Sequence, residues 1–194
     1  TDSLNLYLWQ DGHELLTDLG YLWDHPDKKH LMRTFAHNLV MVDGQEQIQQ
    51  GRGGEFHLFS VSPGVKVMEA SSNAYAQTRT YRRTCVQVDR GDGNAYLLDL
   101  FRVAGGNTFD HVLHGPNRST QLEGLNLESC DPGKMPASGT GLGELRNAQQ
   151  SSGEDAWHVS WTFDDDYVLD ALAPGCVAET VIAGEGWGQR NQFN

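Results

Sequence analysis

RTFAHNLVMVDGQ, residues 33–45, is the stretch that decides the fold of this chain. His37 stands at its entrance, an apolar run follows from Leu39 to Val42, and Asp43-Gly44 closes the run. A short apolar run that ends at a glycine-containing turn is typical of a β-strand with a buried face. The stretch therefore predicts a strand with a histidine at its mouth.

The residues before this stretch predict a β-hairpin. Leu4, Leu6 and Leu8 alternate with polar and aromatic residues, which is the period-two pattern of a strand. Asp11-Gly12 predicts a tight turn, and residues 14–17 return as the second arm. Asp18 follows that arm directly, so Asp18 and His37 are expected on neighbouring strands.

The remainder of the chain predicts further strands and no amphipathic helix of useful length. Residues 90–94, RGDGN, predict a hairpin turn, and residues 132–152 are rich in Gly, Ser and Pro and predict a surface loop. This pattern favours an all-β fold, a two-layer antiparallel β-sandwich. The expected strands span residues 55–61, 65–68, 79–88, 95–103, 108–114, 157–163, 167–172 and 177–182. The expected core contains Leu4, Leu6, Leu8, Val40, Val42, Phe56, Leu58, Leu98, Leu100 and Val103.

Composition excludes several classes of protein. The 194 residues are enough for one domain with a core, and the net charge of −12 argues against binding to nucleic acid or to an anionic membrane. No apolar run approaches the roughly 20 residues of a membrane span. Three cysteines lack metal-type spacing, and one of them is necessarily unpaired within the chain.

Three motifs carry a family resemblance through their order. They are D-x-L-x-L at residues 2–6, G-x-E-L-L-x-D-x-G-Y at residues 12–21, and R-T-x-A-H-N-x-V-x-V-D-G-Q at residues 33–45. In this order they resemble the C-terminal part of the heparinase II/III-like polysaccharide lyases, a group that includes oligoalginate and other uronate-polymer lyases. YRR at residues 81–83 and FDHVLHG at residues 109–115 add weaker support.

This resemblance implies a domain assignment and partners. Residues 1–194 would be a heparinase II/III-like β-sandwich domain, truncated at both ends. Its partners would be an acidic polysaccharide or oligosaccharide and an N-terminal helical toroid of the same protein, with a periplasmic or secreted location. It would supply a structural metal site and one wall of the cleft in which uronate-containing polysaccharide is cleaved by β-elimination.

The resemblance also implies a structural zinc ion. Asp18 matches the aspartate ligand of the D-x-G motif and His37 matches the histidine ligand of A-H-N, while a third ligand, a histidine, would fall directly before Thr1. From the residues alone a plainer interpretation stands beside it. An aspartate and a histidine without a third ligand are weak evidence for zinc, and the two side chains could simply hydrogen-bond across strands.

Tyr21, Arg33 and Asn38 are the remaining candidates. Uronate lyases need one group that removes the C5 proton and one that protonates the leaving oxygen at C4. The resemblance places the main groups in the toroid and lets Tyr21 reach the cleft, although a tyrosine at a sandwich edge is an equal alternative. Arg33 is a candidate uronate contact because arginine binds carboxylates bidentately, yet solvated arginines are more common. Asn38 is a candidate substrate contact or a strand anchor.

Two functions of different classes therefore remain open. The first is the β-sandwich portion of a polysaccharide lyase, an enzyme in its intact form, with the isolated chain inactive. The second is a non-catalytic carbohydrate-binding or interaction β-sandwich. A cupin-like metal enzyme would need a His-x-His pair, which the chain lacks.

Overall fold

The computed structural model describes residues 2–18, 20, 28–49, 53–136, 138–175 and 179–186. The chain divides into two compact units. Unit 1 comprises residues 1–6 and 39–112, and unit 2 comprises residues 7–38 and 113–194. Among the described residues no helix is both long and apolar enough to cross a membrane.

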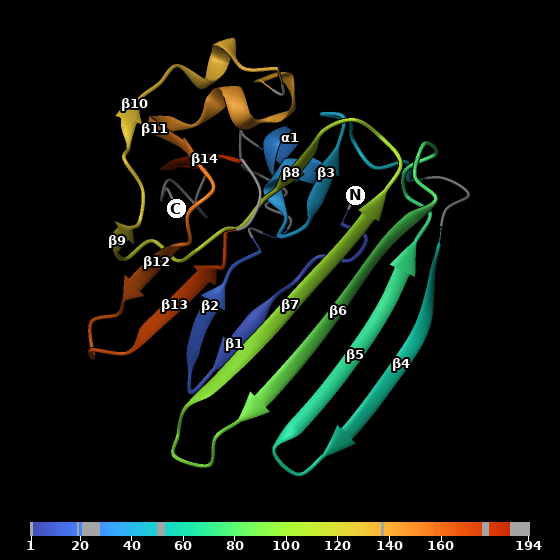
Figure 1. Cartoon of the computed structure of the whole chain (residues 1–194), viewed down its shortest axis with the longest axis vertical. Helices are drawn as coiled ribbons and strands as arrows, with labels where there is room; N and C mark the ends of the chain where they lie inside the picture. The colour runs from blue at the N-terminus through green and yellow to red at the C-terminus, as the bar shows by residue number, and fades with distance from the viewer. Residues whose placement is uncertain are drawn as a thin grey trace. The chain divides into compact units, whose positions relative to one another are not determined.

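Unit 1 is built on a four-stranded antiparallel sheet whose strands follow chain order (Figure 1). The strands are β4 (Gly54–Ser62), β5 (Val65–Ser72), β6 (Thr80–Asp89) and β7 (Ala95–Ala104). The predicted turn at residues 90–94 joins β6 to β7, and Asp89 Oδ1 accepts a hydrogen bond of 2.7 Å from the backbone of Gly91. Glycine is required there because its φ is +76°.

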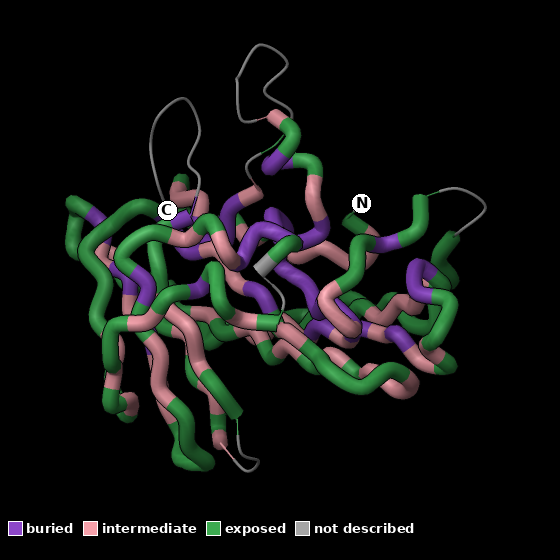
Figure 2. The backbone as a smooth tube through the Cα atoms, turned by 90° about the horizontal axis from the view of Figure 1, so that it is seen from above, coloured by how far each residue is buried: buried purple, intermediate pink, exposed green. Residues whose placement is uncertain are grey.

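The decisive stretch forms a strand, as predicted. β3 (Val40–Val42) is completely buried and pairs antiparallel with β8 (Phe109–His111). Residues 34–42 are all buried. Buried parts of the backbone are drawn in purple in Figure 2. At its end Asp43 Oδ1 accepts hydrogen bonds from the backbone of Asn107 and Thr108, at 2.6 and 3.0 Å, and these bonds lower the pKa of Asp43.

The core of unit 1 forms around two tyrosines. Tyr75 and Tyr81 meet edge to face at 5.2 Å and pack with Val40 and Val42. Leu4, Phe101 and Val103 pack against this cluster. The buried Tyr81 hydroxyl donates to the carbonyl of Val40 at 2.7 Å and accepts from Gln47 Nε2 at 3.1 Å, so its polar end is fully used.

The prediction of the core was wrong for four residues. Phe56, Leu58, Leu98 and Leu100 are exposed by 46% or more. The register places Leu58 and the two leucines of β7 on the face of the sheet opposite to Tyr81, and Phe56 lies on the outermost strand. Both faces of this sheet carry apolar residues. Alternation therefore showed which residues share a face but not which face is covered.

Unit 2 contains the N-terminal hairpin and two three-stranded sheets. The hairpin joins β1 (Leu8–Gln10) to β2 (His13–Leu16) through the predicted turn. One sheet has the order β13-β12-β9 and the other β10-β11-β14. Their strands are β9 (Ser119–Glu123), β10 (Glu128–Ser129), β11 (Arg146–Gly153), β12 (Trp157–Thr162), β13 (Val168–Ala173) and β14 (Glu179–Glu185).

The helical content of the described part of unit 2 is small. It comprises α1 (Lys28–Leu31) and the 3₁₀ helices η1 (Thr34–Ala36), η2 (Pro132–Lys134), η3 (Ser138–Thr140) and η4 (Leu142–Glu144). The predicted surface loop at 132–152 was therefore only partly correct, because it ends in strand β11. Its polar sequence, RNAQQSSG, lacks the apolar alternation that marks a strand.

The predicted fold class is confirmed. The chain is all-β and belongs to the β-sandwich class, with antiparallel sheets and only short helices among the described residues. Cys85 is buried in unit 1 and Cys130 is partly buried in unit 2, and both are free thiols. Cys176 lies outside the described residues.

Tyr81→Phe is expected to lower the free energy of unfolding by about 1–3 kcal/mol, because the carbonyl of Val40 and the amide of Gln47 would lose a buried partner. The matched control is Tyr96→Phe on β7, where the side chain is 57% exposed and the change should stay within about 0.5 kcal/mol. Chemical denaturation of both variants measures the difference. Equal losses would contradict the assigned role of the Tyr81 hydroxyl.

Candidate functional site

The aspartate of the D-x-G motif lies at the end of β2. Asp18 is partly buried, and its Oδ1 accepts a hydrogen bond of 2.8 Å from the backbone of Gly20. Gly20 has a φ of +63°, a conformation that favours glycine. The aspartate thus organises its own turn and keeps its second oxygen, Oδ2, for another partner.

That partner is His37, which directly follows η1. The backbone N–H of His37 donates to the carbonyl of Thr34, and its side chain is buried. His37 Nδ1 lies 3.0 Å from Asp18 Oδ2. The other ring nitrogen, Nε2, is buried and has no hydrogen-bond partner among the described residues. The structure therefore brings the two predicted metal ligands into contact.

The geometry of this pair fits both interpretations of the motif. A carboxylate on Nδ1 fixes the tautomer of an imidazole and leaves Nε2 as a base or a ligand. Two ligand atoms of a tetrahedral zinc site lie about 3.3 Å apart, given metal–ligand bonds of about 2.0–2.2 Å, so Asp18 Oδ2 and His37 Nδ1 could equally share a cation. No cluster of three or more His, Cys, Asp or Glu side chains with metal-binding geometry occurs within the described part of the chain.

Asn38 holds the backbone around this pair. It is completely buried, its Nδ2 donates to the carbonyl of Thr17 at 2.8 Å, and its Oδ1 accepts from the backbone of His114 at 2.5 Å. Both ends of the amide are thus used inside unit 2. Its complete burial and its two hydrogen bonds accord with the strand-anchor interpretation, while its role as a substrate contact stays a prediction.

His114 completes the surroundings of the pair. One of its ring nitrogens, Nε2, lies 2.7 Å from the carbonyl of Phe35, whose ring it meets edge to face. Burial is the main cause that lowers the pKa of His114, and the nearby His37 adds to it. A neutral His114 that donates to a carbonyl supports the packing of this region.

Arg33 contacts the η3–η4 segment. Its Nη1 donates to the carbonyl of Gly139 at 3.1 Å and lies 3.6 Å from Glu144 Oε1. His30 Nδ1 lies 2.7 Å from the other oxygen of the same carboxylate. Glu144 therefore ties α1 and Arg33 to the η3–η4 segment. Tyr21, the predicted catalytic residue, lies outside the described residues.

The two adjacent arginines of β6 divide between the two faces of the unit 1 sheet. Arg83 is 5% exposed and grips Asp99 with two hydrogen bonds, from Nε to Oδ1 at 2.8 Å and from Nη2 to Oδ2 at 2.5 Å. Its neighbour Arg82 points to the opposite face, where it pairs with Glu69. Arg102 of β7 binds the same carboxylate.

Sequence reasoning missed Glu69, Asp99 and Arg102. The sequence contained one signal for them, the adjacent pair Arg82-Arg83. Adjacent residues of a strand point to opposite faces, and an arginine that is removed from water needs a carboxylate, so the pair indicates a carboxylate on each face. Hydrogen bonds from Arg82 and Thr84, the latter at 2.5 Å, lower the pKa of Glu69 to about 2, and the charges of Arg82 and Arg102 add to the shift.

Comparison with known proteins identifies the family. The model of the family described as Heparinase II/III-like, C-terminal, matches residues 1–186, and the chain belongs to this family. Among solved structures, the crystal structure of the heparan sulfate lyase HepC from Pedobacter heparinus is similar, with 11% identity and a TM-score of 0.45. The match covers 97% of this chain and 31% of the HepC chain, so the chain spans about a third of that protein's length. No curated protein sequence matches the chain.

Glu69→Gln is expected to lower the melting temperature at neutral pH, because Arg82 and Arg102 would lose their shared anion. The folded pKa of about 2 lies below the unfolded value of about 4.3, so the stabilisation is fully present above about pH 4.3 and is lost as the pH falls towards 2. Melting curves of wild type and variant should therefore converge in acid.

The control is Glu55→Gln, at an exposed glutamate of β4 in the same sheet. This variant should follow wild type across the pH series, since surface charges contribute little. A gap between Glu69→Gln and wild type that stays constant down to pH 2 would contradict the ionised state assigned to Glu69.

Proposed function

We propose that the chain is the β-sandwich portion of a polysaccharide lyase that cleaves uronate-containing polysaccharide by β-elimination. Membership of the heparinase II/III-like family supports this proposal. The observation that carries it is the contact of Asp18 with His37, with the buried Nε2 of His37 left unpartnered among the described residues. A buried polar atom without a partner is costly, so this nitrogen is expected to have a partner in the intact protein.

The reaction divides into two proton transfers. A uronate residue loses its C5 proton, the bond from C4 to the glycosidic oxygen breaks, and that oxygen takes up a proton. We assign Tyr21 to proton transfer at the cleft, with the further groups supplied by the helical toroid of the intact protein. The acidic polysaccharide and the toroid are the proposed partners, and a periplasmic or secreted location accords with such a substrate.

Asp18 and His37 would hold a structural zinc ion in the intact protein. Their donor atoms, one oxygen and one nitrogen, are of the type that zinc prefers. A bound zinc ion would supply a rigid cross-link. In this chain Asp18 organises the Gly20 turn and contacts His37, which precedes β3, so the cross-link would pin that turn to the start of the buried run. Two ligands rarely suffice for tight zinc binding, so the third must come from elsewhere.

Arg33 is the proposed uronate contact, although it already lies near a carboxylate of this chain. The Glu144 carboxylate lies 3.6 Å from its guanidinium, and the Arg33 side chain is 30% exposed. An arginine in a weak, partly exposed pair keeps donors for a second carboxylate. This engagement with Glu144 is also the observation that favours the second candidate function, a non-catalytic carbohydrate-binding sandwich in which Arg33 is structural.

A lyase assay on the intact protein separates the two functions. We expect a panel of uronate polymers to yield unsaturated product, followed by its ultraviolet absorbance, and Tyr21→Phe to lower turnover by at least about a hundredfold, since general acid–base groups contribute about 10²–10⁴. Polymer binding without unsaturated product would favour the binding module. The isolated chain should show no turnover, because the remaining proton-transfer groups lie outside it.

His37→Ala is expected to reduce zinc affinity at least about tenfold and to lower thermal stability, because the cross-link between the two motifs is lost. Turnover should fall with it, through misplacement of the cleft wall. Atomic absorption on the purified intact protein measures the metal. His158→Ala, at a partly buried histidine of β12, is the control and should keep wild-type zinc. Equal zinc in His37→Ala and wild type would exclude His37 as a ligand.

A further inference from the structure

The four-stranded sheet of unit 1 has one covered face and one exposed face. Val40 and Val42 of β3 pack with Tyr81, so β3 covers the face that carries Tyr81. The cross-strand register places a second set of apolar side chains on the opposite face, here named the outer face. Its apolar residues are Leu58, Val65, Val67, Val86, Val88, Tyr96, Leu98 and Leu100.

The outer face is large and open enough to be one side of a protein interface. Leu58, Val65, Tyr96, Leu98 and Leu100 are 38–57% exposed. Strands of ten residues, such as β6 and β7, are about 33 Å long, and four strands are about 19 Å wide, so the plane of the face measures about 600 Å². Side chains raise the accessible area above that of the plane, and a standard interface buries roughly 800 Å² per partner. Exposed apolar surfaces of this size mark interaction sites.

The distribution of charge indicates that a second copy of the chain is the partner. The register places Glu55, Glu69, Arg82 and Arg102 on the outer face, where two negative and two positive charges balance. The whole net charge of −12 therefore lies on the rest of the chain. Two identical acidic chains repel each other wherever that charge lies, and the outer face lets them meet without this repulsion.

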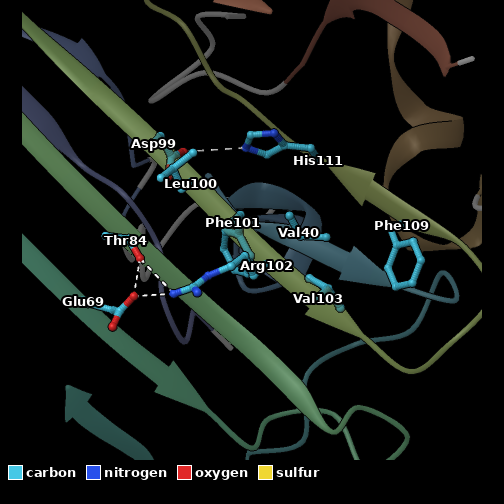
Figure 3. Close-up of a pocket in the computed structure, with 10 residues that line it drawn as sticks. All are labelled: Val40, Glu69, Thr84, Asp99, Leu100, Phe101, Arg102, Val103, Phe109 and His111. Atoms are coloured by element: carbon cyan, nitrogen blue, oxygen red, sulfur yellow. Dashed lines mark hydrogen bonds and ion pairs between the residues drawn. The ribbon is translucent and has the colours of Figure 1, made fainter. Parts of the chain in front are cut away.

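The charges at the two ends of β6 and β7 specify the orientation of the copies. At one end Arg82 and Arg102 share the carboxylate of Glu69, which leaves an excess of one positive charge. Figure 3 shows Arg102 reaching across β6 to Glu69. At the other end the β6–β7 turn, residues 89–92, carries two aspartates and one arginine, which leaves an excess of one negative charge. Unlike ends meet when β7 of one copy lies antiparallel over β7 of the other. Glu55 stays apart from this contact, because it lies on β4, at the opposite edge of the sheet.

We propose that the outer face is the interface of a symmetric dimer, formed with a second copy of the same protein. The two sheets pack face to face about 10 Å apart, with their apolar side chains interdigitated. Twofold symmetry uses the same patch on both copies, so each Arg102 meets the β6–β7 turn of the other copy. Leu98 and its cross-strand partner Val86 lie between the two charged ends and therefore nearest to the twofold axis. The dimer does not depend on the proposed lyase function, because no residue assigned to the lyase site belongs to this sheet.

Sedimentation velocity of the intact protein over a series of concentrations tests this proposal. We expect a dimer in wild type. Leu98→Glu brings two like charges into apolar contact near the axis and should weaken association at least about a hundredfold, since a buried charge without a partner is strongly unfavourable. The control is Leu172→Glu on β13 of unit 2, which adds the same charge at a leucine that is 73% exposed and should leave association unchanged. Circular dichroism verifies that each variant is folded.

A charge exchange tests the orientation of the two copies. Arg102→Glu places a negative charge opposite the acidic turn, and Asp92→Arg places a positive charge opposite the arginine end, so each single variant should weaken association several-fold. The double variant Arg102→Glu/Asp92→Arg brings unlike charges together again and should restore most of the loss. A role of either residue only within its own copy would not produce this recovery, because the two side chains lie at opposite ends of β7.

Three results would overturn the proposal. The first is an intact protein that stays monomeric at the highest concentration measured. If Leu98→Glu then also lowers the melting temperature, another part of the intact protein covers the outer face. The second is equal weakening by Leu98→Glu and Leu172→Glu, which would mean that only the added charge matters. The third is a double variant that associates no better than either single variant, which would exclude the antiparallel arrangement.

Discussion

The buried guanidinium of Arg83 is the constraint on which unit 1 depends. A charge that is only 5% exposed must be paired, and Asp99 pairs it with two hydrogen bonds. Arg83 Nη1 also donates to the carbonyl of Leu4 at 2.7 Å, so one side chain joins β6, β7 and the N-terminal segment. The Arg83–Asp99 pair also specifies the register of β6 against β7. A shift by one residue would exchange Arg83 with Arg82 and bury the wrong side chains.

The same constraint explains the arrangement on the outer face. Once Arg83 points inward, Arg82 must point outward, and the register brings it opposite Arg102. Glu69 then relieves the repulsion between the two arginines. The cluster of two arginines around one carboxylate on the outer face is thus a consequence of the register that the Arg83–Asp99 pair specifies.

Sequence reasoning predicted the strands with strong alternation and clear turns. β4, β6 and β7 lie where the pattern placed them, β5 is longer than predicted, and the Asp18–His37 contact lies where the two motifs implied it. Sequence reasoning failed where the rest of the fold decides which face of a strand is buried. Leu98 and Leu100 alternate like core residues but lie on the exposed face, and the local pattern of β7 cannot report what covers it. The partnership of Arg102 with Glu69 depends on the alignment of three strands, which no short window contains.

Net charge is a poor guide to what this protein binds. A chain at −12 would repel an anionic polymer at long range, yet charges beyond about 8 Å are largely screened at physiological salt. Recognition therefore depends on the few groups within contact distance. Where arginines outnumber carboxylates locally, as around Glu69, an acidic protein can still offer a site for an anion. In the proposed lyase, the acidic remainder of the surface would disfavour other orientations of an anionic polymer, because they would bring like charges together.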